Sequence, residues 1–154
     1  MPELIYAHTK EEYEAAAALF KEYAAWLKID LCFQHFDEEL QQLSAMYALP
    51  HGGIILCKDN DRFIGCVGIR RINDETAEMK RMWIRTDQHG KGLGTVLLNK
   101  ALELAKNCGY KKIQLDTLND MTPAINLYRK NGFVEIPAYY HNPDSRALYF
   151  EKLL

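Results

Sequence analysis

The chain has 154 residues, a length that suits one domain able to bury a core without disulfides or metal ions. Its formal net charge of -2, from 19 basic and 21 acidic residues, argues against a surface built to bind nucleic acid or a membrane. No stretch approaches the roughly 20 apolar residues of a membrane span, and the cysteines and histidines lack the spacing of a zinc site. We therefore expect a cytoplasmic protein with reduced thiols and no metal.

Local patterns predict the elements in chain order. Thr9 and Glu12 have the spacing of a capping box, Asp59-Asn60-Asp61 is a turn between two β-prone runs, and Gly109 is placed to end a helix. The predicted elements are a strand at residues 4–7, helices at 9–27 and 37–49, strands at 53–58, 62–70 and 78–84, a helix at 93–108, a strand at 111–117, a helix from 123, and strands at 133–136 and 147–153. This order predicts a single α/β domain over residues 1–154, with one mixed central sheet flanked by helices.

Helical periodicity also predicts which faces are buried. The first helix is expected to bury Tyr13, Ala16, Ala17, Phe20, Ala24 and Leu27. The helix after residue 92 is expected to bury Leu93, Val96, Leu97, Ala101, Leu104, Ala105 and Cys108. Trp26 and Phe33 lie near the first of these stripes and are interpreted as core residues.

A glycine-rich loop, His89-Gly90-Lys91-Gly92-Leu93-Gly94, lies between a predicted strand and a predicted helix. No glycine precedes Gly90 at the distance that a P-loop needs, and both registers of a dinucleotide fingerprint fail at the third glycine. Asp116 stands about where the ribose-binding acid of such a fingerprint would be, but this agreement is weak alone. Backbone amides at a helix N-terminus suit a pyrophosphate. A tight connection without a ligand is the alternative, and the conformational cost of three nearby glycines disfavours it.

Three segments together resemble the GNAT N-acetyltransferase superfamily. The glycine loop is similar to the family's acetyl-CoA pyrophosphate loop, with His89 in the place of arginine or glutamine. Residues 124–133 are similar to its Ala-x-x-Leu-Tyr-x-x-x-Gly-Phe signature, and residues 77–84 resemble the strand that pairs with the pantetheine arm. Residues 115–118 and 137–143 resemble a small bacterial subgroup. The resemblance implies acetyl-CoA as cosubstrate, held by Met82, Trp83, Ile84, His89, Gly90, Lys91, Gly92, Leu93, Gly94, Thr95 and Tyr128.

The resemblance also implies catalytic residues. Tyr128 matches the family tyrosine that protonates the departing thiolate or hydrogen-bonds the CoA sulfur, and Glu78 stands where several members place a general base acting through water. The alternative for Tyr128 is core packing, and the alternative for Glu78 is an ion pair with Lys80 or Arg81. Lys80 is expected on the same strand face as Glu78, and Arg81 on the opposite face. Many members carry asparagine where this chain has Met121, and whether Asn119 replaces it is open.

The acceptor is expected between the N-terminal helices and the segment after Phe133. Aromatic Tyr139 and Tyr140 are the candidate substrate residues, and the nearby sequence is neither strongly acidic nor strongly basic. We therefore expect direct acetyl transfer to the primary amine of a small-molecule or amino-acid-like acceptor with an apolar part. A CoA-binding regulatory module without turnover, another acyl donor and a protein amine are alternatives, and a homodimer is left open.

Overall fold

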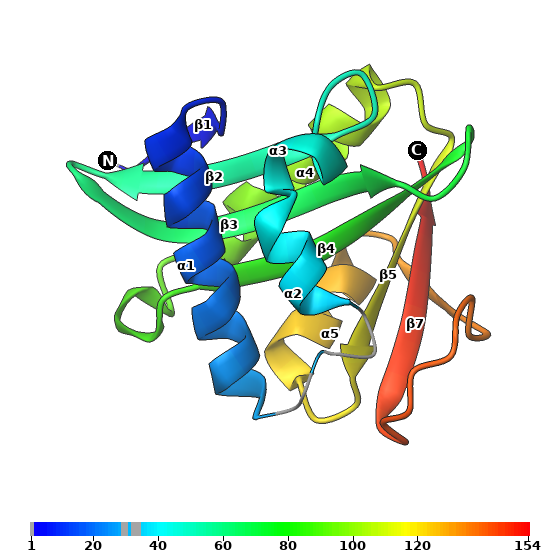
Figure 1. The fold of residues 1–154 in the computed structure, drawn as a ribbon. Helices are drawn as coiled ribbons and strands as arrows, with labels where there is room; N and C mark the ends of the chain where they lie inside the picture. The colour runs from blue at the N-terminus through cyan, green and yellow to red at the C-terminus, as the bar shows by residue number, and fades with distance from the viewer. Residues whose placement is uncertain (1, 29–30, 32–34) are drawn as a thin grey trace.

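The computed structural model describes residues 2–28, 31 and 35–154. Its strands form one seven-stranded sheet in the order β1-β2-β3-β4-β5-β7-β6 (Figure 1). They are β1 Glu3–Tyr6, β2 Gly53–Asp59, β3 Arg62–Arg71, β4 Thr76–Ile84, β5 Lys112–Leu118, β6 Val134–Ile136 and β7 Ala147–Leu153. Among these described strands, neighbours are antiparallel except β4 and β5, which are parallel. This mixed central sheet with its flanking helices confirms the predicted fold class.

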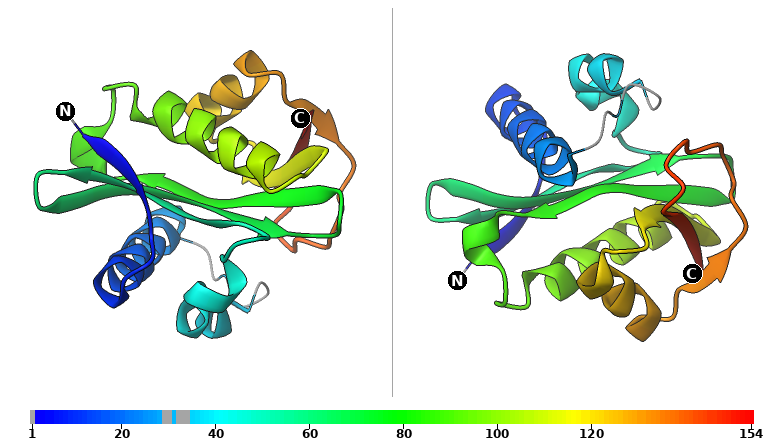
Figure 2. Two further views of the ribbon diagram at one scale, coloured as in Figure 1. Left: turned by 90° about the horizontal axis from the view of Figure 1, so that it is seen from above. Right: turned by 90° about the horizontal axis from the view of Figure 1, so that it is seen from below.

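Helices cover both faces of the sheet (Figure 2). They are α1 Lys10–Leu27, α2 Phe36–Gln41, α3 Leu43–Met46, the 3-10 turn η2 Thr86–Gln88, α4 Leu93–Asn107 and α5 Thr122–Lys130. The first three lie on one face, and α4 and α5 lie on the other. Because each face has its own apolar core, β2 and β3 are buried along most of their length and read as almost continuous apolar runs.

The start of α1 follows from the predicted capping box. The Thr9 side chain accepts a hydrogen bond from the Glu12 backbone at 3.1 Å, and the Glu12 carboxylate accepts one from the Thr9 backbone at 3.0 Å. These two bonds satisfy donors that the first turn of a helix leaves free. The helix buries Ala16, Leu19 and Phe20 against the sheet.

Three local predictions need correction. The helix predicted over residues 37–49 is broken at Gln42 into α2 and α3, because the bend brings Glu39 and Tyr47 into one buried hydrogen bond. On α4, Val96 is 45% exposed and Leu98 is buried instead. Trp26 is 45% exposed, with one ring face on Trp83, and is not a core residue. Phe33 lies outside the described residues.

The strands β4 and β5 pair over only a short length. Their register joins Thr76–Glu78 to Lys112–Gln114, and beyond these residues the two strands diverge (Figure 1). One extra residue also enters β4 opposite β3, where Arg81 has φ 60°. This bulge overturns the period-two expectation for Arg81: its side chain reaches Glu39 of α2, on the sheet face that also carries Lys80.

Candidate active site

The divergence of β4 and β5 opens a gap in the middle of the sheet. A cavity of about 60 Å³ occupies it, lined from β4, β5 and α5 by residues that include Met82, Asp116, Thr117, Met121 and Tyr128. Beyond Glu78, the β4 main chain has no partner strand on this side among the described residues. Its peptide groups are therefore available to an extended ligand or to a developing oxyanion.

The glycine loop lies at the end of β4 and leads directly into α4. Gly90 and Gly92 have φ 81° and 76°, and a Cβ at either position would meet nothing within 4 Å. Gly92 caps α4, and the first helical bond runs from Val96 to Gly92 at 3.3 Å. The amides of the first turn, including that of exposed Thr95, are therefore left for an outside acceptor. Positive φ glycines and free amides at the positive end of a helix form an anion site.

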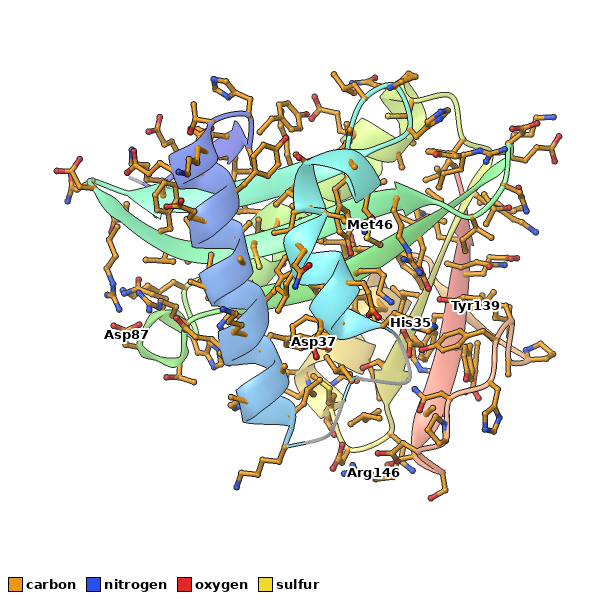
Figure 3. The ribbon with its side chains drawn as sticks, viewed as in Figure 1. His35, Asp37, Met46, Asp87, Tyr139 and Arg146 are labelled. Carbon is orange, nitrogen blue, oxygen red and sulfur yellow. The ribbon has the colours of Figure 1, made fainter. Side chains whose placement is uncertain are left out.

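Side chains hold this loop in place. The His89 imidazole Nε2 lies 2.7 Å from the Ile84 carbonyl, and Lys91 donates to Gln88 at 2.9 Å. On the α1 side, Glu22 accepts from Arg85 Nε at 3.1 Å, and the Arg85 guanidinium lowers the pKa of that carboxyl. Asp87 at the loop edge pairs with Arg62 at 2.9 Å (Figure 3). The loop is thus tied to α1 and to the hairpin on either side.

Trp83 and Ile84 differ in their surroundings from Met82, the third residue of β4 that was predicted to hold the donor. Neither lines the gap cavity, whereas Met82 does. The Trp83 ring packs on Tyr23 and Trp26 in the α1 core, and Ile84 packs against the core under α4. Both can therefore serve a donor through their main chains, which is how the sequence resemblance placed them.

Tyr128 projects from α5 into the gap. It is buried, and its ring packs against Phe133 and Phe150. Burial raises the pKa of its phenol, so the hydroxyl stays protonated and able to donate. Tyr128 thus lines the gap cavity and also packs in the core, which was the alternative to a catalytic role. Asn119 is exposed, and Met121 lines the cavity at the family's asparagine position.

A second cavity, of about 360 Å³, lies on the other face of the sheet beside α2 and α3. Its floor carries Arg70, Glu78 and Lys80, and its rim includes His35, Met46 and Tyr140. Figure 3 shows His35 at the start of α2 and Tyr139 in the segment before β7. Lys80 lines both this cavity and the gap cavity. One residue of β4 is therefore common to the lining of both cavities.

The charged floor corrects the expectation of an uncharged aromatic site. Glu38, Glu39, Glu78, Arg70 and Lys80 all line the larger cavity. They come from α2, β3 and β4, and the loop sequence alone does not contain them. A signal existed in the alternation of Arg70, Glu78 and Lys80 on β-prone strands, because charges predicted inside a sheet need a buried partner.

Glu78 has an ion-pair partner that the sequence did not indicate. Arg70, directly opposite on β3, donates from Nε to Glu78 Oε1 at 2.8 Å. Lys80 Nζ is 4.0 Å from the same oxygen, whereas Arg81 pairs with Glu39 at 2.9 Å. The Tyr139 hydroxyl donates to Glu78 Oε2 at 2.7 Å. The predicted pairing with Lys80 is thus present at long range, and the one with Arg81 is absent.

The segment before β7 connects the two diverging strands. Tyr139 donates to Glu78 on β4, and the Tyr140 hydroxyl donates to Asp116 on β5. Tyr149 adds a third ring, 5.3 Å from Tyr139 and 5.6 Å from Tyr140, and donates to the Tyr140 carbonyl at 2.9 Å. Of the two predicted substrate residues, Tyr140 lines the larger cavity and Tyr139 holds Glu78.

Lys80 is a buried cation that the sequence did not single out. Loss of hydration lowers its pKa from the ordinary value of 10.5 to about 8, and nearby Glu78 opposes that change. Its ammonium therefore loses a proton much more readily than an exposed lysine does. The part of the chain described by the structure contains no helix long and apolar enough to cross a membrane and no cluster suited to a metal ion.

The structure thus combines a gap between β4 and β5, a glycine loop that caps α4, and a larger cavity on the other face of the sheet. Residues 20–133 match the acetyltransferase (GNAT) family, and the chain belongs to that family. An uncharacterized N-acetyltransferase of Schizosaccharomyces pombe is 34% identical over 85% of this chain and 82% of its own. The protein is therefore an acyl-CoA-dependent acyltransferase.

Solved structures share the fold at low sequence identity. An acetyltransferase from Streptococcus agalactiae has a TM-score of 0.82 at 22% identity, covering 99% of this chain and 98% of that one. A GNAT family acetyltransferase from Elizabethkingia anophelis, with acetyl-CoA bound, has a TM-score of 0.68 at 21% identity, covering 99% and 98%. The sheet and its flanking helices are thus common to these proteins.

Proposed function

We propose that this protein transfers an acetyl group from acetyl-CoA to the primary amine of a small, amino-acid-like acceptor. The observation that carries the proposal is the position of Lys80 in the lining of two cavities, one in the gap between β4 and β5 and one beside α2 and α3. A donor and an acceptor bound from opposite faces would bring their reacting atoms together along β4. The related structure with acetyl-CoA bound supports the acetyl donor.

The donor would be held mainly by main-chain groups. The loop from His89 to Gly94 and the exposed first turn of α4 present amides to a pyrophosphate. The unpaired edge of β4 from Met82 to Ile84 would pair with the pantetheine arm, and an amide there would stabilise negative charge on the thioester oxygen.

Transfer then needs two proton movements. An alkylammonium has a pKa of about 10.4 if it resembles lysine, so it must lose a proton before attack. Glu78 is our candidate to take that proton through one water, since it lines the acceptor cavity. The neutral nitrogen forms a bond to the acyl carbon, and the carbon–sulfur bond breaks. Tyr128 gives its proton to the departing sulfur and takes up the second proton that the acylated nitrogen loses. The products are an N-acetyl compound and CoA.

A CoA-release assay with a panel of primary amines tests the proposal. Each amine is combined with acetyl-, propionyl- or succinyl-CoA, and the N-acyl product is identified by mass spectrometry. We expect turnover to be fastest with acetyl-CoA and a small amine. Calorimetric binding of CoA without release in any combination would instead indicate a regulatory CoA-binding module.

The assignment of Glu78 has its own test. If Glu78 is the base, Glu78→Gln flattens the rising acidic limb of the pH–rate profile. An unchanged limb would leave Glu78 with the structural role that its bonds to Arg70 and Tyr139 already show.

A further inference from the structure

Arg70 and Glu78 place opposite charges side by side in the floor of the larger cavity. They are register partners on β3 and β4, and the Arg70 Nε donates to Glu78 Oε1 at 2.8 Å. The Arg70 side chain is 30% exposed and the Glu78 side chain 3%, and both line the cavity. An acceptor in this space therefore meets a cation and an anion at once.

Arg70 has N–H groups that make no hydrogen bond to another described residue. A guanidinium carries N–H groups on three nitrogens, and only Nε of Arg70 has a partner among the described residues. In the same part of the chain, no buried side-chain nitrogen or oxygen lacks a hydrogen bond. The terminal nitrogens of Arg70 must therefore be accessible, and Arg70 is one of the residues that line the cavity. This fork suits the two oxygens of a carboxylate.

The other buried charges beside the cavity are more fully committed. Glu39 accepts from Arg81 through both oxygens and from the Tyr47 hydroxyl. Glu78 accepts from Arg70 and Tyr139, one bond to each oxygen, and a carboxylate oxygen can accept a second. Besides the Lys80 ammonium, the floor thus offers donors on Arg70 and an acceptor on Glu78.

Building on the proposed function, we propose that the acceptor is a free α-amino acid whose carboxylate binds the terminal nitrogens of Arg70 and whose amino group faces Glu78. In such a molecule the two charged groups are joined to the same carbon, which matches two opposite charges already in hydrogen-bond contact. The cavity of about 360 Å³ is of the size that takes a small molecule. Met46 at the rim offers an apolar contact to the acceptor side chain.

Matched acceptor pairs test this assignment. Leucine, methionine, phenylalanine and glutamate are each compared with their α-carboxamides at saturating acetyl-CoA, and kcat/KM is measured by CoA release. We expect the wild-type protein to prefer at least one free acid by roughly ten- to a hundredfold, the value of a charge-assisted hydrogen bond. The ratio of kcat/KM for the free acid to kcat/KM for its amide should fall close to one in Arg70→Gln and be partly kept in Arg70→Lys. The KM for acetyl-CoA should stay constant in both variants.

Arg71→Gln is the matched control. Arg71 is the next residue of β3, is exposed, and pairs with Asp74 away from both cavities. Its loss removes the same charge and should leave the acid preference unchanged. Because the preference is a ratio within one variant, a general loss of activity does not mimic the effect.

The outcomes separate the two proposals. Equal use of every acid and its amide by the wild type, or an unchanged preference in Arg70→Gln and Arg70→Lys, overturns the amino-acid assignment and leaves acetyl transfer standing. Absence of turnover with any amine overturns the proposed function and, with it, this inference.

Discussion

Tyr128 carries the sharpest prediction at the scale of single residues. Its hydroxyl lies in the gap between β4 and β5, and burial raises its pKa, so it can donate a proton across the physiological range. We expect Tyr128→Phe to lower kcat by about 10²–10⁴-fold, as for loss of a general acid, with acetyl-CoA affinity near wild type. Steady-state kinetics and calorimetry measure the two quantities. A kcat within twofold of wild type would assign Tyr128 to packing alone.

Lys80 makes stability depend on pH in a definite direction. Its pKa is about 8 in the folded protein and 10.5 when exposed, so the unfolded chain binds more protons between these values. The free energy of unfolding contributed by Lys80 therefore rises as pH increases from about 8 to 10.5. Below pH 8 both states are protonated, and the cost of burying the charge is largest.

The variant Lys80→Met isolates this effect. Both proteins are unfolded in urea at pH 7.5, 8.5 and 9.5. The free energy of unfolding of the wild type should rise relative to that of the variant by up to about 1.4 kcal/mol per pH unit above pH 8. Tyrosines and Cys66 also have raised pKa values, but they are common to both proteins and cancel in the difference. Parallel pH curves for the two proteins would contradict the lowered pKa.

At the scale of elements, α4 offers a test with an internal control. Gly92 and Gly109 stand at its two ends with φ 76° and 89°, and an added Cβ would be in open space at both. Alanine at either position should cost roughly 1–2 kcal/mol of backbone strain. Only Gly92→Ala should also weaken acetyl-CoA binding, by about tenfold or more, because it turns charge-assisted amide donors away from the pyrophosphate.

Calorimetry and thermal unfolding read the two effects separately. Similar losses of thermal stability with unequal losses of affinity would support a main-chain anion site. Equal affinities in Gly92→Ala and Gly109→Ala would show that the loop is only a connection. A third variant, Gly94→Val, adds bulk in the first turn of α4 at a position whose φ is ordinary. A Cβ there lies 3.4 Å from the Leu127 side chain.

The segment before β7 belongs to the same scale, because it connects β4 and β5 through two phenols. Tyr140 lines the larger cavity and donates to Asp116, which Asn142 also contacts at 3.2 Å. We expect Tyr140→Ala to raise the acceptor KM by about tenfold through loss of an aromatic contact, and the acetyl-CoA KM much less. Tyr6→Ala, at the exposed β1 edge, is the control. If the KM for the acceptor and the KM for acetyl-CoA change by the same factor, the segment has a structural role only.

For the whole molecule, the gap makes donor binding a source of stability. Among the described residues, β4 and β5 pair only at Thr76–Glu78 and Lys112–Gln114, and beyond this pairing they are connected by packing and by the segment before β7. A ligand that binds the folded state alone adds about 2.7 kcal/mol at a hundred times its Kd. Acetyl-CoA should therefore raise Tm by roughly 5–10 °C for a chain of this size. Scanning calorimetry with adenosine as a control tests this, and an unchanged Tm would argue against a formed donor site.

The elements and the backbone conformation of the glycine loop could be predicted because their signals are local. The Thr9 capping box, the hairpin turn and the glycines around residue 92 act within a few residues, and the structure shows the corresponding helix start, hairpin and positive φ angles. The motif from residue 124 to 133 likewise placed Tyr128 on a helix. Burial on α4 was predicted less well at Val96 and Leu98, because the edge of a helix stripe depends on what packs there.

The charged cavity beside α2 and α3 was decided by tertiary structure alone. Arg70 and Glu78 are eight residues apart in the chain and become partners only through strand register, and Arg81 reaches Glu39 because a bulge turns it to the other face. The break at Gln42 and the parting of β4 from β5 were likewise not predicted from local patterns. The sequence by itself determined the elements and the anion loop through short-range sterics and hydrogen bonding. The charged cavity required the whole sheet, because desolvated charges are tolerated only where the fold brings their partners together.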